Sequence, residues 1–301
     1  MLNPLHLRTL SVVLRTGSFA AAGRHLGYTG SAVSQQMSAL EADSGLLLFE
    51  REAQGVRPTA EAQLLSERAI DALGAFAALQ DAVREMAAGT RGRLSLGSFP
   101  TASEVLIPRA LARFGRDFPD VEVRFEDGEP HQLVTRLLEG DLDVIVVFRY
   151  DLVPQSWPPG CLRTPLLTEP VRLLVPDRGE APAGRVPLTD FADASWISTR
   201  EGTGGTLALE RACAAAGFAP HIRYRSNDYD VVRSFVRAGF GVAAVPRLAY
   251  LGRLGLRDVD VTGLHLRRHV EALTRTDRHN PATAGMVAAL RVSAQTALAD
   301  P

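Results

Sequence analysis

The chain has 301 residues, of which 46% are apolar and 22% are charged. These ordinary values predict a folded globular protein of about two domains, and they exclude the disordered and fibrous classes. Its 33 basic residues, all of them arginine, balance 34 acidic residues and leave a net charge of -1. This balance excludes a protein that coats nucleic acid through bulk charge, but it does not exclude a local DNA-reading surface.

The two cysteines and the distribution of apolar residues limit where the protein can be located and which chemistry it can carry out. Cys161 and Cys213 are far apart, fit no metal-ligand spacing and leave open whether either has a redox role. No basic segment followed by an apolar run opens the chain, and no stretch reaches about 18 uninterrupted apolar residues. We therefore expect a cytoplasmic protein with no membrane partner. No zinc, phosphate-loop or serine-hydrolase motif occurs, so we expect no metal, no cofactor and no enzyme activity.

Three short helices are predicted in the first sixty residues. Asn3 is a capping residue before a proline, and Gly17 ends the first helix. Ser18 caps the second helix, Gly27 ends it, and the third begins near Ser31. Two helices joined by a tight glycine-containing turn are typical of a helix-turn-helix, although an ordinary three-helix bundle gives the same pattern.

The third predicted helix carries a polar face opposite its apolar stripe. The side chains on that face are small, uncharged and able to hydrogen-bond, and they belong to Ser31, Ser34, Gln35 and Ser38. Glutamine can bond an adenine edge through two hydrogen bonds, and serine can contact several bases in the major groove. Arg51 and Arg57 follow in the sequence and would hold phosphates, which position a reader without specifying bases.

A long helix is predicted from Thr59 to about Ala88, where there is no proline and one glycine. Its apolar residues recur at alternating steps of four and three, as in a heptad seam, at Leu65, Ala69, Ala72, Phe76, Leu79, Val83 and Met86. Such a seam packs either on the protein's own core or on a second chain, and the length of the run favours a second chain. Residues 89–92 then break the helix and mark a hinge.

From about residue 93 onward, predicted strands alternate with predicted helices. Leu94–Leu96 and Val121–Phe125 predict strands, each followed by a helical pattern, and the nearly continuous apolar stretch Asp143–Val147 predicts a third strand. A second series runs from 171 to 245, and a late strand at 270–274 precedes a final helix. The alternation predicts an α/β region with open parallel sheets.

Two of these strands end in polar helix starts, at residues 98–103 and 198–203. Ligands of open α/β sheets bind beyond the carboxyl ends of strands, and helix N-termini favour anions because they offer free N–H donors. We therefore expect a small, anionic effector, held by Ser98, Thr101, Ser103, Arg149, Thr199, Arg200 and Thr203. The serines and threonines would serve equally well as ordinary helix caps.

Five segments of the first sixty residues form a specific pattern: SFAAA at 18–22, LGYT at 26–29, SAVSQQM at 31–37, LE at 40–41 and LFER at 48–51. This pattern closely resembles the LysR-type transcriptional regulator family. The segments GDLDVI at 140–145 and AGFGVAAVP at 238–246 look like the co-inducer-binding domain of the same family. Together these resemblances cover nearly the whole chain.

The resemblance implies an α+β multidomain protein with an N-terminal winged helix-turn-helix, a long linker helix and a C-terminal α/β effector domain. The effector domain would have two lobes, similar to periplasmic solute-binding proteins, with strands crossing near Arg163–Leu166 and Arg268–Val270. The expected domains are 1–58 for the winged helix-turn-helix, 59–91 for the linker helix and hinge, and 92–301 for the effector domain. Within the last, lobe I would be 92–164 with 268–301, and lobe II would be 165–267.

The resemblance also implies a function and further contacts. It adds Thr29 to the base contacts and places a wing over Leu48–Arg57. It implies a homodimer or homotetramer that reads double-stranded DNA with an imperfect inverted repeat, under the control of a small-molecule effector. Three residues depart from the family's pattern. Gly30 stands where glutamine is frequent, which affects one base contact. Ser44 replaces a usual apolar residue and is expected to loosen the third helix's end, and Ala62 replaces a frequent glycine after the wing, with no functional interpretation.

Two alternatives from other classes fit parts of this pattern. A solute-binding protein would share the two lobes, but it would need export and would not need the N-terminal helices. An α/β enzyme with a structural helix-turn-helix would need a nucleophile, base or metal constellation, and none is visible in the sequence.

Overall fold

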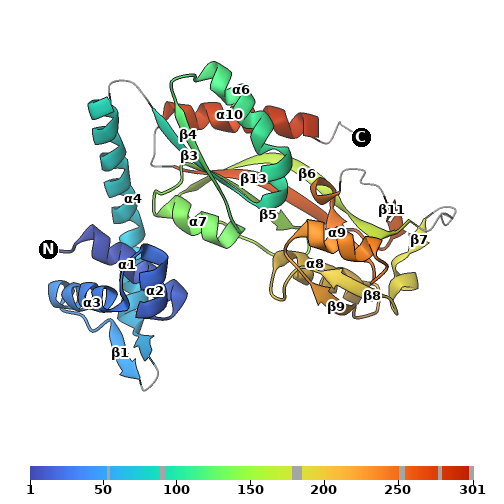
Figure 1. Ribbon diagram of the computed structural model, residues 1–301, viewed down its shortest axis with the longest axis horizontal. Helices are drawn as coiled ribbons and strands as arrows, with labels where there is room; N and C mark the ends of the chain where they lie inside the picture. Colours follow the sequence, from blue (N-terminus) through green and yellow to red (C-terminus); the bar gives the residue numbers. More distant parts are fainter. Residues whose placement is uncertain (53–54, 89–91, 178–184, 251–254, 277–279, 298–301) are drawn as a thin grey trace. The chain divides into compact units, whose positions relative to one another are not determined.

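The computed structural model describes residues 1–52, 55–88, 92–177, 185–250, 255–276 and 280–297 (Figure 1). The chain forms two compact units. The first is Met1–Gly92 together with Val134–Leu142, and the second is Arg93–Leu133 together with Asp143–Pro301. Within the described ranges, every helix is too short or too polar to cross a membrane.

Three helices and a hairpin form the N-terminal part of the first unit, coloured blue in Figure 1. They are α1 (Pro4–Thr16), α2 (Phe19–Leu26), α3 (Gly30–Ser44) and the antiparallel strands β1 (Phe49–Glu52) and β2 (Gly55–Pro58). Their apolar faces meet in one core, in which Leu10, Val33 and Met37 are almost completely buried. The expected helix-turn-helix with a wing is therefore present.

Short polar side chains start all three helices. The side chains of Asn3, Ser18 and Thr29 accept hydrogen bonds from backbone N–H groups in the first turns of α1, α2 and α3. Such caps satisfy donors that have no partner inside the helix. Because Thr29 is the cap, α3 begins at Gly30, one residue before the predicted start at Ser31.

The end of α3 is tied to the wing. The Glu41 carboxylate accepts hydrogen bonds from the backbone N–H groups of Leu48 and Phe49, at 2.8 and 3.1 Å. Ser44 accepts a further bond from the N–H of Leu46, at 3.3 Å. The serine at this position thus closes the helix end instead of loosening it, which corrects the expectation for Ser44.

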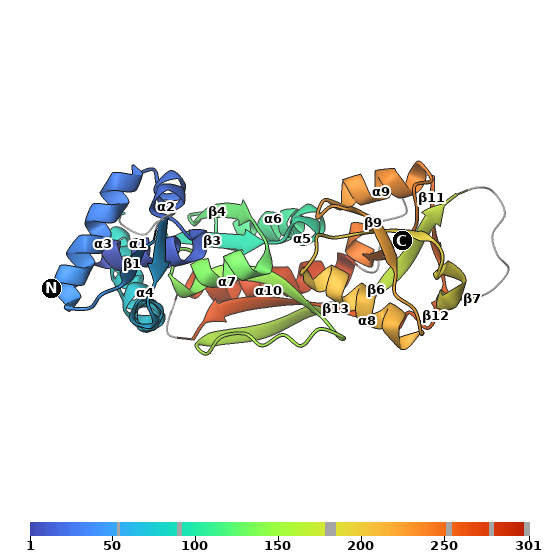
Figure 2. The ribbon, with the colours of Figure 1, turned by 90° about the horizontal axis from the view of Figure 1, so that it is seen from below.

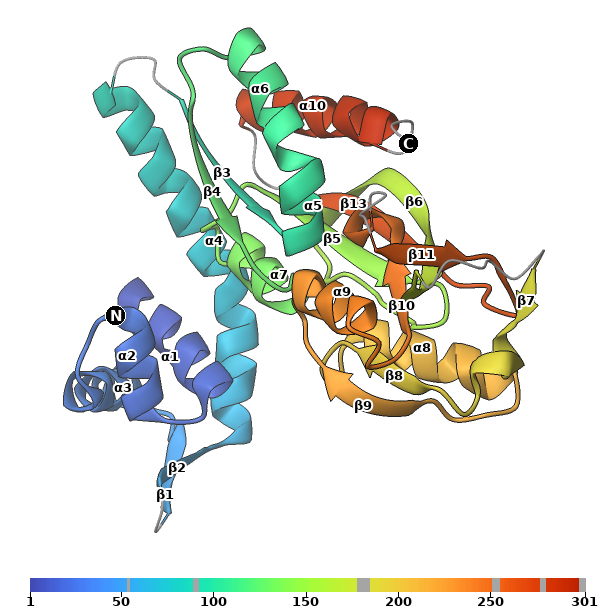
Figure 3. The same ribbon diagram turned by 45° about the vertical axis from the view of Figure 1, so that its right-hand side comes forward.

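The first half of α4 (Ala60–Ala88) packs on the three-helix core, and Figure 3 shows the helix running past that cluster. Ala62, Ala69 and Leu73 are buried there, and Leu65 packs against the same core. Leu65 and Ala69 were expected on a seam between chains. That expectation is wrong for these two residues, because a heptad pattern does not distinguish a partner helix from a core of the same chain.

In the second half of α4, the described large apolar side chains are exposed. Ala72 is exposed, and the exposed fractions of Phe76, Leu79 and Val83 are 43%, 59% and 51%. The side chain of Met86, the last residue of the predicted seam, lies outside the described residues. An isolated apolar surface residue is ordinary, but a row of them at heptad spacing favours a partner.

The second unit contains one seven-stranded sheet in the order β10-β6-β13-β5-β3-β4, with β11 also beside β6. Its strands are β3 (Arg93–Ser98), β4 (Glu122–Asp127), β5 (Val144–Tyr150), β6 (Cys161–Pro176), β10 (Ala243–Pro246), β11 (Leu256–Val259) and β13 (Arg267–Arg275). β3 is parallel to β4 and β5, whereas β13 is antiparallel to β5 and β6. The sheet is mixed and not parallel throughout as predicted, because β13 returns from lobe II and enters from the opposite end.

The helices α5 (Pro100–Val105), α6 (Ile107–Asp117) and α10 (Pro281–Ala297) pack on one face of this sheet, with α6 and α10 side by side in Figure 1. The sheet contributes Val146, Phe148 and Val270 to that core. Successive strand residues point to opposite faces. Arg149 and Glu271 therefore lie on the opposite face of the sheet from α5, α6 and α10. A further helix, α7 (Pro130–Leu138), precedes β5.

β6 is shared by two lobes. Its first part, up to Pro170, pairs with β13, and its second part, from Val171, pairs with β10 and β11. Around the second part lie the elements drawn in yellow and orange in Figure 2: β7 (Val186–Pro187), β8 (Ser195–Ser198), α8 (Gly204–Ala215), β9 (His221–Arg225), α9 (Tyr229–Arg237) and β12 (Val261–Thr262). Short 3-10 turns occupy Leu188–Phe191 and Arg247–Ala249. A separate core centres on Trp196 and Leu209.

We predict that Gly23→Ala opens the helix-turn-helix. A Cβ at Gly23 would lie 2.7 Å from the Tyr28 carbonyl oxygen, a backbone atom that cannot move without shifting the turn between α2 and α3. Such overpacking costs about 1–3 kcal/mol, so amide hydrogen exchange in α2 and α3 should become about 5- to 100-fold faster. The matched control is Gly115→Ala in α6, where a Cβ meets no atom within 4 Å. Unchanged exchange in α2 and α3 would contradict the argument.

Candidate functional site

The outward face of α3 is polar and exposed to solvent. Val33, Met37 and Leu40 are buried, whereas Ser31, Gln35 and Ser38 are exposed and Ser34 is half-buried. In the part of the chain that the structure describes, the Gln35 side chain makes no hydrogen bond. The neighbouring Gln36 accepts a hydrogen bond from Thr9 at 2.7 Å, so it is committed to the fold. The predicted base-reading residues thus share one surface.

Thr29 and Gly30 lie at the start of this face. The Thr29 hydroxyl accepts the Ala32 N–H at 3.2 Å and lies 2.9 Å from the Ser31 hydroxyl, so part of its hydrogen-bonding capacity serves the cap. A Cβ on Gly30 would lie 3.2 Å from the Cα of Ala20 in α2. The glycine therefore permits close packing of the two helices.

The wing carries the arginines expected at phosphates. Arg57 lies on β2 with its side chain 65% exposed, and it forms an ion pair with Glu50 across the hairpin at 2.5 Å. An exposed pair of this kind contributes at most about 1 kcal/mol, so the guanidinium can exchange this partner for a phosphate. Arg51 belongs to β1, but its side chain lies outside the described residues.

A small cavity lies in the second unit between β5, β6 and the start of α8. Its walls include Tyr150 and Val171 on one side and Ser198, Thr199 and Gly205 on the other. The enclosed space, about 10 Å³, admits the centre of roughly one water molecule. We call it the cleft cavity. Of the predicted effector residues, Thr199 lines it directly.

Hydroxyl groups form a network at the α8 side of the cleft cavity. The Thr199 hydroxyl lies 2.7 Å from the Thr203 hydroxyl and 3.1 Å from the Thr206 hydroxyl. The Ser198 hydroxyl also lies 3.1 Å from the Thr206 hydroxyl. Thr203 donates to the Arg200 carbonyl at 2.6 Å and does not cap α8. The first N–H groups of α8 therefore lack a side-chain cap. Gly205 keeps this helix start close to Thr199, since a Cβ would lie 2.9 Å from the Thr199 hydroxyl.

A buried ion pair occupies the strands behind the cleft cavity. The side chains of Arg268 and Glu169 are 1% and 0% exposed, and the Nε–Oε1 distance is 2.7 Å. The Arg268 guanidinium also donates to the Thr101 hydroxyl at 2.9 Å, and the other Glu169 oxygen accepts the Leu248 N–H at 2.6 Å. Burial has the largest single effect and opposes the charge of Arg268, but Glu169, Tyr150 and Tyr229 together outweigh it, so the pKa of this arginine lies above its usual range.

This pair changes the roles of the residues predicted after β3. Thr101 is buried and bonds Arg268, whereas the Ser98 and Ser103 hydroxyls both donate to the Phe99 carbonyl. These three residues serve local structure, and none of them lines the cleft cavity. Arg268 and Glu169 were not predicted as site residues. Their pairing spans 99 positions, and no local spacing reveals it.

Two tyrosines complete the wall. Burial raises the pKa of Tyr150 and raises the pKa of Tyr229 well above its usual value of 10, even though the nearby Arg268 charge opposes both shifts. Both phenols therefore stay protonated at neutral pH and present hydroxyl groups to the cleft cavity.

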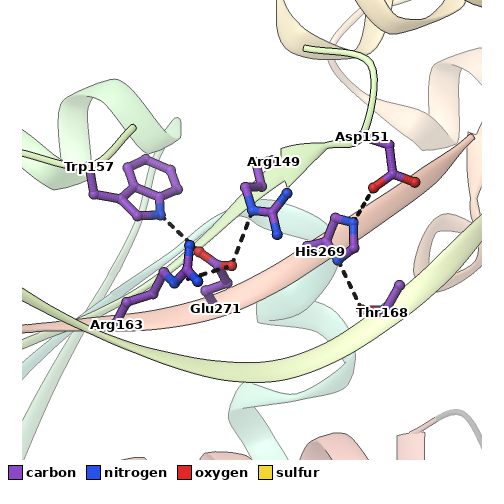
Figure 4. Close-up of polar contacts among 7 residues, drawn as sticks. All are labelled: Arg149, Asp151, Trp157, Arg163, Thr168, His269 and Glu271. Atoms are coloured by element: carbon purple, nitrogen blue, oxygen red, sulfur yellow. Dashed lines mark hydrogen bonds and ion pairs between the residues drawn. The ribbon is translucent and has the colours of Figure 1, made fainter. Parts of the chain in front are cut away.

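The prediction for Arg149 is wrong. Its Nε lies 3.2 Å from the Glu271 carboxylate, which also accepts the Trp157 indole N–H at 2.8 Å and lies 3.8 Å from Arg163 (Figure 4). Arg149 precedes Tyr150 on β5, so the pleat places the two side chains on opposite faces. Because Tyr150 lines the cleft cavity, Arg149 points away from it.

Arg200 also departs from the prediction. Its backbone N–H donates to the Asn227 side chain at 2.9 Å, its side chain is exposed, and it does not line the cleft cavity. The two expected cations are thus both absent from that cavity. Its described polar groups are hydroxyls and backbone N–H groups.

Neither the two cysteines nor any described cluster of side chains has the features of a reactive thiol or a metal site. Burial raises the pKa of Cys213 to about 12 and also raises the pKa of Cys161, so both thiols remain protonated at neutral pH. Neither has the lowered pKa of a reactive thiol. Among the described residues, no group of three or more histidine, cysteine, aspartate or glutamate side chains has the geometry to hold a metal ion.

The class of protein follows from these parts, since a winged helix-turn-helix is joined by a long helix to a two-lobed α/β domain with a cavity. Family models agree with this division. Residues 5–63 match the bacterial regulatory helix-turn-helix protein, lysR family, and residues 87–295 match the LysR substrate binding domain. The chain belongs to the LysR family of DNA-binding transcriptional regulators, which carry an effector-binding domain.

Similar proteins have the same organisation. The HTH-type transcriptional regulator CbbR of Rhodospirillum rubrum is 27% identical and covers 97% of this chain and 98% of its own length. The uncharacterized HTH-type transcriptional regulator YcgK of Bacillus subtilis is 29% identical over 78% of this chain and 77% of its own. Full-length CbnR complexed with its target DNA has a TM-score of 0.58 and 24% identity, covering 97% of this chain and 100% of that one.

We predict that Glu169→Gln strongly destabilises the second unit. Removing one partner leaves the Arg268 charge buried without its counter-charge, which costs about 3–5 kcal/mol. Both tryptophans of the chain, Trp157 and Trp196, lie in the second unit, so urea unfolding followed by tryptophan fluorescence reports on it alone. Glu122→Gln is the control, because its pair with Arg124 is exposed and contributes at most about 1 kcal/mol.

A double variant separates the two causes of such a loss. Glu169→Gln combined with Arg268→Met removes both charges and should recover most of the lost free energy of unfolding. Equal instability of the single and double variants would show that packing, and not the unpaired charge, is responsible.

Proposed function

We propose that the chain reads an operator with two half-sites as a homo-oligomer, and that an effector in the cleft cavity changes how the reading helices are presented. The exposed polar face of α3 is the observation that carries this proposal. It consists of side chains able to hydrogen-bond to base edges, while Thr29 caps the helix that carries them and Glu41 ties its end to the wing. CbnR, which was solved with its target DNA, supplies a structural precedent.

The reading domain should bind with limited help from charge. Its arginines are few, and the described pair between Arg57 and Glu50 offsets one of them. The salt dependence of DNA binding follows the number of neutralised phosphates, so we expect a modest slope. Specificity would therefore depend on direct contacts from Ser31, Ser34, Gln35 and Ser38, with Thr29 as a further contact at the start of the helix.

The effector is proposed to bind at the start of α8. The uncapped N–H groups of this helix favour an anionic or strongly polar group, and the hydroxyls of Thr199, Tyr150 and Tyr229 supply directional hydrogen bonds. Arg149 and Arg200 do not line the cavity, so only the start of α8 favours an anion there. A cavity this small requires the lobes to open for entry, and the effector shifts the regulator only if it binds one lobe arrangement better than the other.

The test of the whole proposal is selection of genomic fragments by the purified full-length chain, followed by sequencing. We expect a few enriched sites that share an imperfect inverted repeat. If no sequence is enriched, with or without cell metabolites, the helix-turn-helix is a structural module and the operator model fails.

We predict that Gln35→Ala weakens binding to the selected operator about 5- to 100-fold, because loss of a two-point contact to a base costs about 1–3 kcal/mol. The loss should be larger for the preferred operator than for a scrambled duplex, as measured by fluorescence anisotropy. Gln155→Ala in the second unit is the matched control and should change neither affinity. Unchanged affinity and unchanged sequence preference in Gln35→Ala would remove Gln35 from the reading face.

We predict that Leu79→Arg lowers the oligomeric state, because a charge on the exposed row of α4 must be desolvated when a partner helix packs there. Sedimentation equilibrium should show a species of about half the parent mass, with reduced operator affinity. Leu162→Arg, at an equally exposed leucine on β6, is the control and should keep the parent mass. If the mass of Leu79→Arg equals that of the parent, the row on α4 is not the oligomer contact.

A further inference from the structure

A second concave site lies outside the cleft cavity, where β6 crosses into lobe II. The site encloses about 310 Å³ between Pro170–Arg172 of β6, Val259–Val261 and the Leu264–Arg267 segment that leads into β13. Asp151 and Arg185 also line it. We call it the crossover pocket. Its volume is at the lower end of the range for small-molecule sites, so a metabolite-sized ligand fits it.

The carboxylates of the crossover pocket are already paired. Asp260 lies between two arginines, 3.0 Å from the Nε of Arg185 and 3.8 Å from Arg172. Arg172 also pairs with Asp258 at 3.2 Å. Asp151 bonds the His269 ring, whose other nitrogen lies 3.0 Å from the Thr168 hydroxyl (Figure 4). These carboxylates therefore have little capacity left to bind a cationic ligand.

Two basic side chains of the crossover pocket, unlike its carboxylates, have no described partner. Arg267 and His265 both line the crossover pocket and are exposed, and within the described residues neither side chain has a hydrogen bond or an ion pair. Of the three lining arginines, Arg172 and Arg185 pair with Asp258 and Asp260, whereas Arg267 has no ion pair with a described carboxylate. A planar guanidinium without a partner in a concave wall is suited to a carboxylate or a phosphate, which it can hold through two parallel hydrogen bonds.

The crossover pocket and the cleft cavity are distinct but adjacent. They share the side chains of Val171 and Leu266, one from each crossing segment, and have no other lining residue in common. Both sites have apolar walls, but the polar groups of the cleft cavity are hydroxyls, whereas those of the crossover pocket belong to arginine, histidine and aspartate. The two sites therefore select different ligands.

From this arrangement we infer that the crossover pocket binds a small anionic metabolite through a carboxylate or phosphate group, with Arg267 as the principal contact. This ligand is additional to the effector of the cleft cavity. Arg172 and Arg185 hold its remaining polar groups through N–H donors that Asp258 and Asp260 do not use. Since the ligand would contact β6 and the segment entering β13 at once, it bridges both crossing points between the lobes.

The experiment is calorimetric titration of the full-length chain with inorganic phosphate and with citrate, at an ionic strength held constant with sodium chloride. We expect saturable binding of at least one of these anions at one site per chain. Arg267→Gln should weaken it at least about 10-fold, as expected for loss of a charge-assisted contact. Arg113→Gln removes an exposed arginine of α6 and should leave the affinity unchanged.

A second variant separates the two cavities. Gly205→Val fills the cleft cavity, since a Cβ there already lies 2.9 Å from the Thr199 hydroxyl, and it should leave anion binding intact. Loss of binding in Gly205→Val with retention in Arg267→Gln would place the anion in the cleft and overturn the inference. Absence of saturable binding of both anions up to about 10 mM would overturn it as well. An effect equal in Arg113→Gln and Arg267→Gln would show only general screening of surface charge.

Discussion

The contact between Arg268 and Glu169 holds together the part of the second unit on which ligand binding depends. One residue comes from β13 and the other from β6, and these are the two strands that pass between the lobes. Thr101 from α5 and the backbone of Leu248 satisfy further hydrogen-bonding groups, and the guanidinium lies 4.9 Å from the Phe99 ring centroid. A buried pair adds little net stability compared with apolar packing, but a fully bonded one specifies a single arrangement of its strands. The pair therefore joins the two crossing strands through their side chains, in addition to the backbone hydrogen bonds between them.

This pair also determines the chemistry of the cleft cavity. Arg268 is the arginine beside Tyr150, and its charge is neutralised before any ligand arrives. The polar groups beside the cleft cavity are then neutral hydroxyls and the helix start at Gly204. Groups of this kind distinguish ligands by shape and by the direction of hydrogen bonds more than by total charge. In the crossover pocket, the arginine without a described ion pair is Arg267, the adjacent residue, because neighbouring strand positions face opposite sides of the sheet.

The sequence predicted the N-terminal unit well because its determinants are local. The caps at Asn3, Ser18 and Thr29 act within three residues, and the buried stripe of α3 follows from helical spacing alone. The effector residues were predicted less well because their environment depends on long-range pairing. Arg149 was placed by its position after a strand, but its face depends on which residues of β13 lie beside it. Thr101 was read as a ligand contact because nothing near it in the sequence announces Arg268. The same limit applies to α4, where spacing identified the apolar row but not where the internal core stops.

The continuous course of β6 has a mechanical consequence. The strand runs for 16 residues, with backbone hydrogen bonds to β13 in its first part and to β10 and β11 in its second. The lobes are thus joined by an ordered ribbon and not by a loose loop. Motion of one lobe relative to the other must therefore twist this ribbon, and the backbone hydrogen bonds of the ribbon resist that twist. On the proposed function, an effector would act by the work that it does against this twist.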